Sequence, residues 1–229
     1  MLQSAYKTGY STKTALLKIT NDILLNMDKP RVILLVLLDM SAAFDTIPHH
    51  LFLKRIEHTF GISGEALRWF KSYFEERQQR VTIESKFSED TALEIGLPQG
   101  AGAGRFGYKV YTKPLGSVIR AISLEVLYHM FADDNQLHRS LNPNIIASQT
   151  NARSDLETCI NGLSSWLYDN KLKLNKSKTE LLIIGKKSQL AKMSFDTVTI
   201  GNESLPSHVL TTLVFTLMLN HPCGSKLSV

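Results

Sequence analysis

The sequence has little cysteine, no long hydrophobic run and no secretion signal, and each absence excludes a class of protein. Cys159 and Cys223 are its two cysteines. With no Cys-x-x-Cys pair and no neighbouring histidine cluster, neither a disulfide framework nor a structural zinc site is indicated. The N-terminal residues lack the apolar segment of a signal peptide, and the apolar run at residues 32–38 is far shorter than the roughly 20 residues that cross a bilayer. We therefore expect an intracellular protein, of the cytoplasm or the nucleus, with no membrane partner.

The common nucleotide-binding loops are also missing. No Gly-x-Gly-x-x-Gly opens a helix after the first apolar run. Residues 100–104 alternate Gly and Ala, but they lack the Gly-Lys-Ser/Thr ending of a P-loop. Neither a dinucleotide-binding fold nor a P-loop enzyme is therefore indicated.

What is present is an ordinary globular composition with a mild basic excess. The 229 residues are 43% hydrophobic and carry a net charge of +5, which fits one domain or at most two and suits a polyanionic partner without requiring one. Residues 171–192 contain seven lysines and a single acid, Glu180. This tract has two interpretations, a solvated surface or a surface that contacts phosphates.

Hydrophobic periodicity predicts helices and strands that mix without regular alternation, which is typical of an α+β fold. The predicted helices cover residues 14–27, 49–59, 63–77, 105–121 (at least its second half) and 144–170. The predicted strands cover residues 32–38, 80–83, 92–95, 124–130, 135–141 and 181–184, and the pattern fades after residue 185.

Three carboxylates stand at the ends of predicted strands. Asp39 follows the buried run at residues 32–38, and Asp133 and Asp134 lie at or beside the turn of a predicted hairpin. A charge at the end of a buried strand is costly unless something binds it. A strand end and a tight turn that present three carboxylates can hold two divalent cations against a phosphate. The pattern predicts a site that holds two divalent cations against a phosphate.

Four segments around these carboxylates follow one another in the order found in one family. They are Leu-Leu-Asp-Met-Ser-Ala-Ala-Phe-Asp at residues 37–45, Leu-Pro-Gln-Gly at residues 97–100, Phe-Ala-Asp-Asp at residues 131–134 and Asn-Lys-Ser-Lys-Thr-Glu at residues 175–180. Together they resemble the reverse transcriptases, specifically those of LINE-type, non-LTR retrotransposons. The resemblance covers residues 3–185.

The resemblance implies an α+β polymerase palm, in which helices back an antiparallel sheet, with partial fingers between the first two motifs. The thumb is expected to be missing, so the chain is expected to be a truncated domain. Residues 1–185 would form the palm and fingers. Residues 186–229 would be a C-terminal remnant, with the start of the primer-gripping hairpin at residues 210–219. The oligomeric state is left open.

The implied activity is RNA-directed DNA polymerisation, which uses an RNA template, a DNA primer and deoxynucleoside triphosphates. Two Mg²⁺ ions, with Mn²⁺ as the alternative, would activate the primer 3′-hydroxyl and brace the leaving pyrophosphate. The implied site residues are Asp39, Asp133 and Asp134 as metal ligands, Lys178 as proton donor to the pyrophosphate, Phe44 against the sugar of the incoming nucleotide, and Gln99 and Gly100 beside that nucleotide.

Each of these roles has a structural alternative. Phe44 would be a core aromatic, Gln99 would satisfy loop backbone groups, and Lys178 would be one lysine of a solvated tract in which Lys176 competes for the same role. We expect His49 to be an ordinary polar residue at the start of a helix rather than a ligand. Gly107 stands at an apolar helix position of the family, and a glycine inside a helix costs about 1 kcal/mol relative to alanine.

Two other functions remain open from the sequence. In the first, the chain is a catalytically inert remnant that still binds nucleic acid through its basic tract, with a salt-dependent affinity. Alternatively, the same palm would serve an RNA-directed RNA polymerase. Phe44 separates this reading from the reverse transcriptase, because an aromatic ring against the sugar excludes a 2′-hydroxyl.

Overall fold

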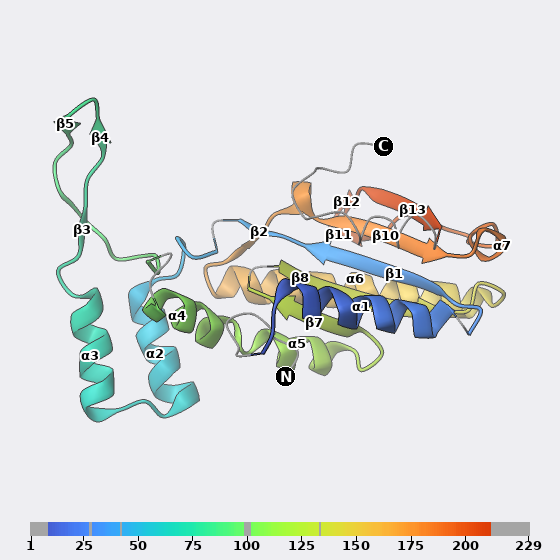
Figure 1. The fold of residues 1–229 in the computed structure, drawn as a ribbon, viewed down its shortest axis with the longest axis horizontal. Helices are drawn as coiled ribbons and strands as arrows, with labels where there is room; N and C mark the ends of the chain where they lie inside the picture. The colour runs from blue at the N-terminus through green and yellow to red at the C-terminus, as the bar shows by residue number, and fades with distance from the viewer. Residues whose placement is uncertain (1–8, 28, 42, 99–101, 133, 212–229) are drawn as a thin grey trace. The chain divides into compact units, whose positions relative to one another are not determined.

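The computed structural model of the chain describes residues 9–27, 29–41, 43–98, 102–132 and 134–211. The chain divides into two compact units. Unit 1 is drawn from residues 1–40, 116–165 and 174–229, and unit 2 from residues 41–115 and 166–173. Figure 1 labels the helices and strands of both units. The predicted division at residue 185 stays a prediction.

A five-stranded sheet in the order β13-β10-β1-β8-β7 forms the centre of unit 1 (Figure 1). Its strands are β1 (Val32–Leu38), β7 (Leu127–Phe131), β8 (Asp134–Leu141), β10 (Glu180–Gly185) and β13 (Ser207–Thr211). Neighbouring strands are antiparallel, except that β10 and β13 run parallel. The antiparallel sheet predicted from the sequence is confirmed, and β13 adds a parallel edge from the segment in which the pattern fades.

The middle strand β1 is buried on both faces, which explains its continuous apolar sequence. One face packs against α1 (Thr12–Met27). There Ile19 and Ile23 of the helix meet Ile33 and Leu35 of the strand in a single apolar cluster. Because side chains alternate along a strand, Leu34 and Val36 face the other side of the sheet.

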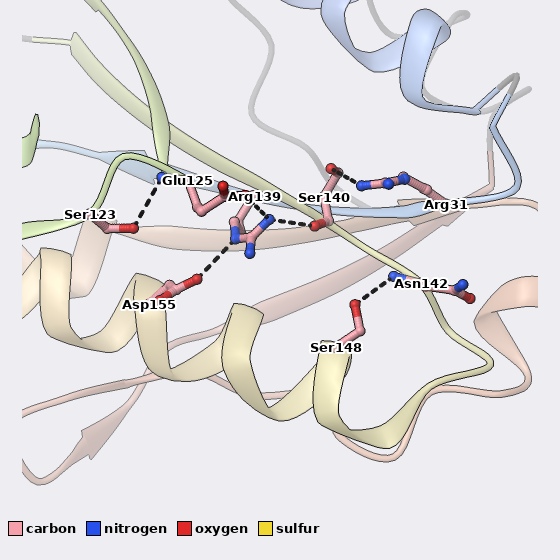
Figure 2. Close-up of polar contacts among 8 residues, drawn as sticks. All are labelled: Arg31, Ser123, Glu125, Arg139, Ser140, Asn142, Ser148 and Asp155. Atoms are coloured by element: carbon pink, nitrogen blue, oxygen red, sulfur yellow. Dashed lines mark hydrogen bonds and ion pairs between the residues drawn. The ribbon is translucent and has the colours of Figure 1, made fainter.

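On that other side, Arg139 joins the sheet to α6 (Ile146–Asp169). Arg139 is the β8 partner of Leu34 in the register, so the two side chains share a face. Figure 2 shows its guanidinium directed at Asp155 of α6, and its Nε lies 3.0 Å from the Asp155 carboxylate. Its Nη1 lies 3.1 Å from the carboxylate of Glu125. The arginine therefore fixes β8, α6 and the segment before β7 to one another, at the end of β8 away from Asp134.

Unit 2 is built around α2 (His49–Phe60), α3 (Gly64–Phe74) and α4 (Gly102–Thr112). Phe52 of α2 packs edge to face against Phe70 and Phe74 of α3, with ring centroids 5.7 and 5.4 Å apart. Gly61 ends α2 in the left-handed conformation, with φ +67°, which glycine adopts without steric cost. The predicted pair of helices separated at Gly61 is confirmed.

Two predictions in unit 2 need correction. Residues 92–95 were expected to form a strand, but only Thr91–Ala92 is one; it is β6 and pairs with β3 (Gln78–Gln79). The backbone of residues 94–97 instead bonds to residues 44–49, which the sequence pattern does not show. The strand predicted at residues 80–83 is shorter, β4 (Thr82–Ile83), and its partner is the unpredicted β5 (Lys86–Phe87).

The helix predicted over residues 105–121 is two helices, α4 and α5 (Leu115–Ile122), separated at Pro114. Proline has no amide hydrogen and disfavours helical geometry in the residue before it, so the break follows from local chemistry. The remaining elements are β2 (Met40–Ser41), β9 (Lys173–Leu174), η1 (Lys176–Lys178), α7 (Lys187–Leu190), β11 (Thr199–Ile200) and β12 (Glu203–Ser204). In the described part of the chain, no helix has both the length and the hydrophobicity to cross a membrane.

Candidate active site

The sheet of unit 1 brings two of the three predicted carboxylates to the same end of neighbouring strands. Leu38, the last residue of β1, pairs with Asn135 of β8. Asp39 follows the first of these residues and Asp134 precedes the second, so both lie at this end of the sheet. Their shared position results from the antiparallel register, because the end of β1 meets the start of β8.

Asp134 begins β8 immediately after a tight turn. It pairs with Phe131 at the end of β7, so two residues separate the paired positions. Ala132, the first of these, has φ +56°, a left-handed conformation that is uncommon for residues other than glycine. Two-residue hairpin loops require such angles. Asp133, the second residue and a predicted metal ligand, lies outside the described residues.

A cavity of about 470 Å³ opens at this end of the sheet. It is lined by Leu37, Leu38, Asp39, Asp134, Asn135, Gln136, Ser177, Lys178 and Glu180. Asp39 is half-buried, whereas Asp134 and Lys178 are exposed. The structure therefore brings together three of the predicted site residues, two carboxylates and one ammonium group, around one solvent-accessible cavity.

The backbone fixes the side of the cavity that carries Lys178. The Asn175 amide donates to the Asp39 carbonyl over 2.9 Å, and the Lys178 amide donates to the Asn175 carbonyl over 3.2 Å. Lys176, the competitor for the same role, is ion-paired with Glu203 at 2.8 Å. The geometry favours Lys178 over Lys176 as the lysine that faces the carboxylates.

Sequence reasoning missed four polar residues of this cavity, Asn135, Gln136, Ser177 and Glu180. Gln136 and Glu180 flank Leu37 from the two neighbouring strands, so the three side chains share one face. Gln136 follows Asp134 by two residues, a spacing that places both on one face of a strand. Glu180 is the lone acid of the lysine-rich tract and directly precedes the predicted strand at residues 181–184, and these are the signals that could have identified it.

The donor set suits a hard divalent cation. Carboxylate oxygens are the ligands that Mg²⁺ and Mn²⁺ prefer, and Asp39 and Asp134 supply them at the mouth of one cavity. Within the described residues, no group of three or more acidic, histidine or cysteine side chains is close enough to form a complete metal site. The third predicted ligand, Asp133, is not among those residues.

The predicted nucleotide-binding residues belong to unit 2. Phe44 is half-buried, and its ring stacks on that of Tyr108 from α4, with centroids 4.4 Å apart and an interplanar angle of 19°. The Leu97 amide donates to the Phe44 carbonyl over 2.7 Å. Phe44 is thus joined to the start of the second motif and to the helix after it. Gln99 and Gly100 lie outside the described residues.

Comparison with known proteins decides the family. A family model described as "Reverse transcriptase (RNA-dependent DNA polymerase)" matches residues 2–205. The chain belongs to the reverse transcriptase family. It is 27% identical over 180 residues to the probable RNA-directed DNA polymerase from transposon BS of Drosophila melanogaster, and 24% identical over 179 residues to the polymerase from mobile element jockey of the same species. Each match covers 77% of this chain and 19% of the relative.

These relatives confirm the predicted kinship with the polymerases of non-LTR retrotransposons. They also show that the chain spans about a fifth of the length of the curated relatives that it matches. The family to which the chain belongs is that of the RNA-directed DNA polymerases. Members of the family generally use divalent metal ions.

Solved structures confirm the fold. The apo telomerase of Candida tropicalis truncated from its C-terminal domain superposes with a TM-score of 0.58 at 16% identity, over 89% of this chain and 39% of that one. The telomerase of the same species in complex with a fragment of telomeric RNA gives a TM-score of 0.59 at 13% identity, over 79% of this chain and 30% of that one. The mixed α/β architecture with its antiparallel-rich sheet is that of a partial reverse transcriptase palm.

Proposed function

We propose that this reverse transcriptase domain catalyses RNA-directed DNA synthesis, with Asp39, Asp133 and Asp134 holding two Mg²⁺ ions at the end of the sheet. The observation that carries the proposal is that Asp39 and Asp134 line one cavity together with Lys178. A bound pair of ions would lower the pKa of the primer 3′-hydroxyl and neutralise charge on the leaving pyrophosphate. RNA template, DNA primer and deoxynucleoside triphosphates are the proposed substrates.

The chain's own residues would position the reactants and move one proton. The primer 3′-hydroxyl would lose its proton to solvent, and its oxygen would form a bond to the α-phosphorus of the nucleotide as the bond from that phosphorus to pyrophosphate breaks. Lys178, an ammonium group at the rim of the cavity, would give its proton to the departing pyrophosphate. In unit 2, Phe44 would press against the nucleotide sugar, and Gln99 and Gly100 would lie beside the same nucleotide.

The test is primer extension on an RNA template by the purified chain. We expect incorporation of deoxynucleotides in Mg²⁺ or Mn²⁺, and loss of at least about a thousandfold in rate for Asp39→Asn, because electrostatic stabilisation of developing charge is a large part of catalysis. The double substitution Asp133→Ala with Asp134→Ala is expected to have the same effect.

A matched control is Asp90→Asn, which removes an exposed carboxylate in unit 2, outside the cavity. Its extension rate should equal that of the wild type. Equal rates for the wild type and the Asp133→Ala/Asp134→Ala protein would refute the polymerase proposal. Salt-dependent nucleic-acid binding without extension would favour the inert remnant in its place.

A further inference from the structure

In unit 2, a ladder of backbone hydrogen bonds joins residues 44–49, at the end of the first motif, to residues 94–97, at the start of the second motif. The Leu97 amide donates to the Phe44 carbonyl over 2.7 Å, and the Gly96 amide donates to the Ile47 carbonyl over 2.8 Å. The His49 amide donates in the other direction, to the Glu94 carbonyl over 3.1 Å. Backbone hydrogen bonds between residues far apart in the sequence therefore connect the two motifs.

Gly96 lies against the backbone of the first motif in this ladder. Its φ of +97° lies in the region that side chains rarely adopt, and a Cβ built on it would come within 3.3 Å of the Asp45 carbonyl oxygen. Among the described residues, no backbone amide donates to the Gly96 carbonyl, and a carbonyl in this position needs a donor. The donor is the side chain of His49, whose Nε2 lies 2.8 Å from the Gly96 oxygen.

The chemistry of this bond fixes the state of the imidazole. A carbonyl oxygen only accepts, so Nε2 carries the hydrogen that it donates. The His49 ring is buried and stacks on Phe74 of α3, with centroids 4.3 Å apart. Burial lowers the pKa of His49, partly opposed by the bond to Gly96, so the ring is neutral at pH 7.

We propose that His49 is a positioning residue for the incoming nucleotide. Its hydrogen bond to Gly96 holds the motif at residues 97–100, which directly follows Gly96. This inference rests on the proposed function, because that motif includes Gln99 and Gly100 as nucleotide-binding residues. His49 touches neither substrate nor metal in this role. It holds the Gly96 peptide group, which leads into the motif. Stacking on Phe74 of α3 fixes the His49 ring itself.

The other side of the motif is also held by close packing, which leaves little freedom for adjustment. A Cβ added to Gly104 of α4 would overlap the Pro98 carbonyl oxygen. A Cβ added to Gly107 would come within 3.0 Å of the Leu97 side chain. Loss of the His49 bond is therefore expected to displace the start of the motif rather than to be absorbed by the helix after it.

Two substitutions separate the hydrogen bond from the ring packing. His49→Phe keeps an aromatic ring against Phe74 and removes the donor. His49→Gln loses the ring but retains an N–H donor. The exposed neighbour His50 supplies the control, His50→Phe. Thermal unfolding of all three proteins shows whether each variant remains folded.

Hydrogen exchange of the Gly96 and Leu97 amides measures the position of the segment without any need for activity. We expect His49→Phe to accelerate exchange of these two amides by about tenfold, as loss of one net hydrogen bond predicts, and to leave α6 unchanged. His49→Gln should recover part of the protection, and His50→Phe should match the wild type. Unchanged exchange in His49→Phe overturns the inference, whether or not the chain polymerises DNA.

Primer extension then tests the link to the nucleotide. His49→Phe is expected to raise KM for the deoxynucleotide by about tenfold with kcat within about twofold, because the metal-binding carboxylates are untouched. Faster amide exchange with an unchanged KM would overturn the positioning role. A wild-type chain that extends no primer would count against the proposed function. The exchange rates of the Gly96 and Leu97 amides would still show whether the His49 hydrogen bond holds this segment.

Discussion

Leu38 of β1 and Asn135 of β8 face each other as paired residues, and this pairing places Asp39 and Asp134 at one end of the sheet. Asp39 and Asp134 line one cavity there, and two carboxylates suit a divalent cation. This relationship supports the proposal that the two carboxylates hold divalent metal ions.

Lys178→Met is expected to slow nucleotide incorporation, because it removes the ammonium group at the rim of the cavity. General acid catalysis contributes roughly 100- to 10,000-fold, so single-turnover extension should slow by at least about 100-fold. Lys176→Met is the matched control, since that lysine pairs with Glu203. Equal slowing by both substitutions would indicate a general effect of basic charge on nucleic-acid binding.

Gly104→Ala should destabilise the chain although alanine is the better helix former. Its Cβ would overlap the Pro98 carbonyl oxygen, and overpacking of this kind costs about 1–3 kcal/mol. Gly102→Ala, at the exposed start of the same helix, meets no atom within 4 Å and should be neutral or slightly stabilising. Urea denaturation of the two variants gives the comparison, and equal stabilities would contradict it.

The same glycines show what the sequence could and could not predict. The continuous run of β1 and the helical periodicity of α2, α3 and α6 arise from local patterns, and the sequence predicts them to within a few residues. Gly107 was expected to weaken a helix, whereas the structure shows that a side chain there would crowd Leu97 and Phe52. Close approach between segments distant in sequence leaves no periodic signal.

The candidate site divides in the same way. Asp39 and Asp134 could be predicted because strand ends and tight turns have local signatures. Gln136 and Glu180 join them only through the register of three strands, and register depends on pairing across the whole sheet. Short elements such as β11, β12 and β13 were missed because two to five residues carry too little periodicity.

Stability is expected to fall in mild acid because three buried histidines resist protonation. Burial is the largest cause that lowers the pKa of His49, His129 and His138. Their folded pKa values lie below the unfolded value of about 6.5, so the unfolded chain binds more protons below that pH. Their contribution is therefore present above pH 6.5 and is lost as the pH falls. Each group contributes a slope of at most about 1.4 kcal/mol per pH unit.

Urea denaturation at pH 7.5 and 5.5 measures this slope. Both ring nitrogens of His138 are buried without a hydrogen bond among the described residues, and its Nε2 lies 4.0 Å from the Asp22 carboxylate. His138→Leu should therefore flatten the pH dependence, whereas His58→Leu, at an exposed position, should not. A wild-type stability that rises from pH 7.5 to 5.5 would show that the protonated rings are accommodated.

Phe44→Ala is expected to admit ribonucleotides if the ring presses against the nucleotide sugar. The ratio of kcat/KM for deoxy- over ribonucleotides should fall by at least about tenfold, since a clash or its absence is worth 1 kcal/mol or more. Removal of the ring also ends its stacking on Tyr108, which contributes about 0.5–1.5 kcal/mol. Lower stability with an unchanged ratio would identify Phe44 as a core aromatic.

The most direct test of the central claim is a Mn²⁺ titration followed by electron paramagnetic resonance, in the presence of a deoxynucleoside triphosphate. The account predicts two bound Mn²⁺ ions per chain, and a loss of affinity of at least about tenfold for Asp39→Asn, Asp133→Asn and Asp134→Asn. Asp90→Asn should bind as the wild type does. Equal Mn²⁺ affinity in the wild type, Asp39→Asn and Asp134→Asn would contradict the claim that these carboxylates hold the metal.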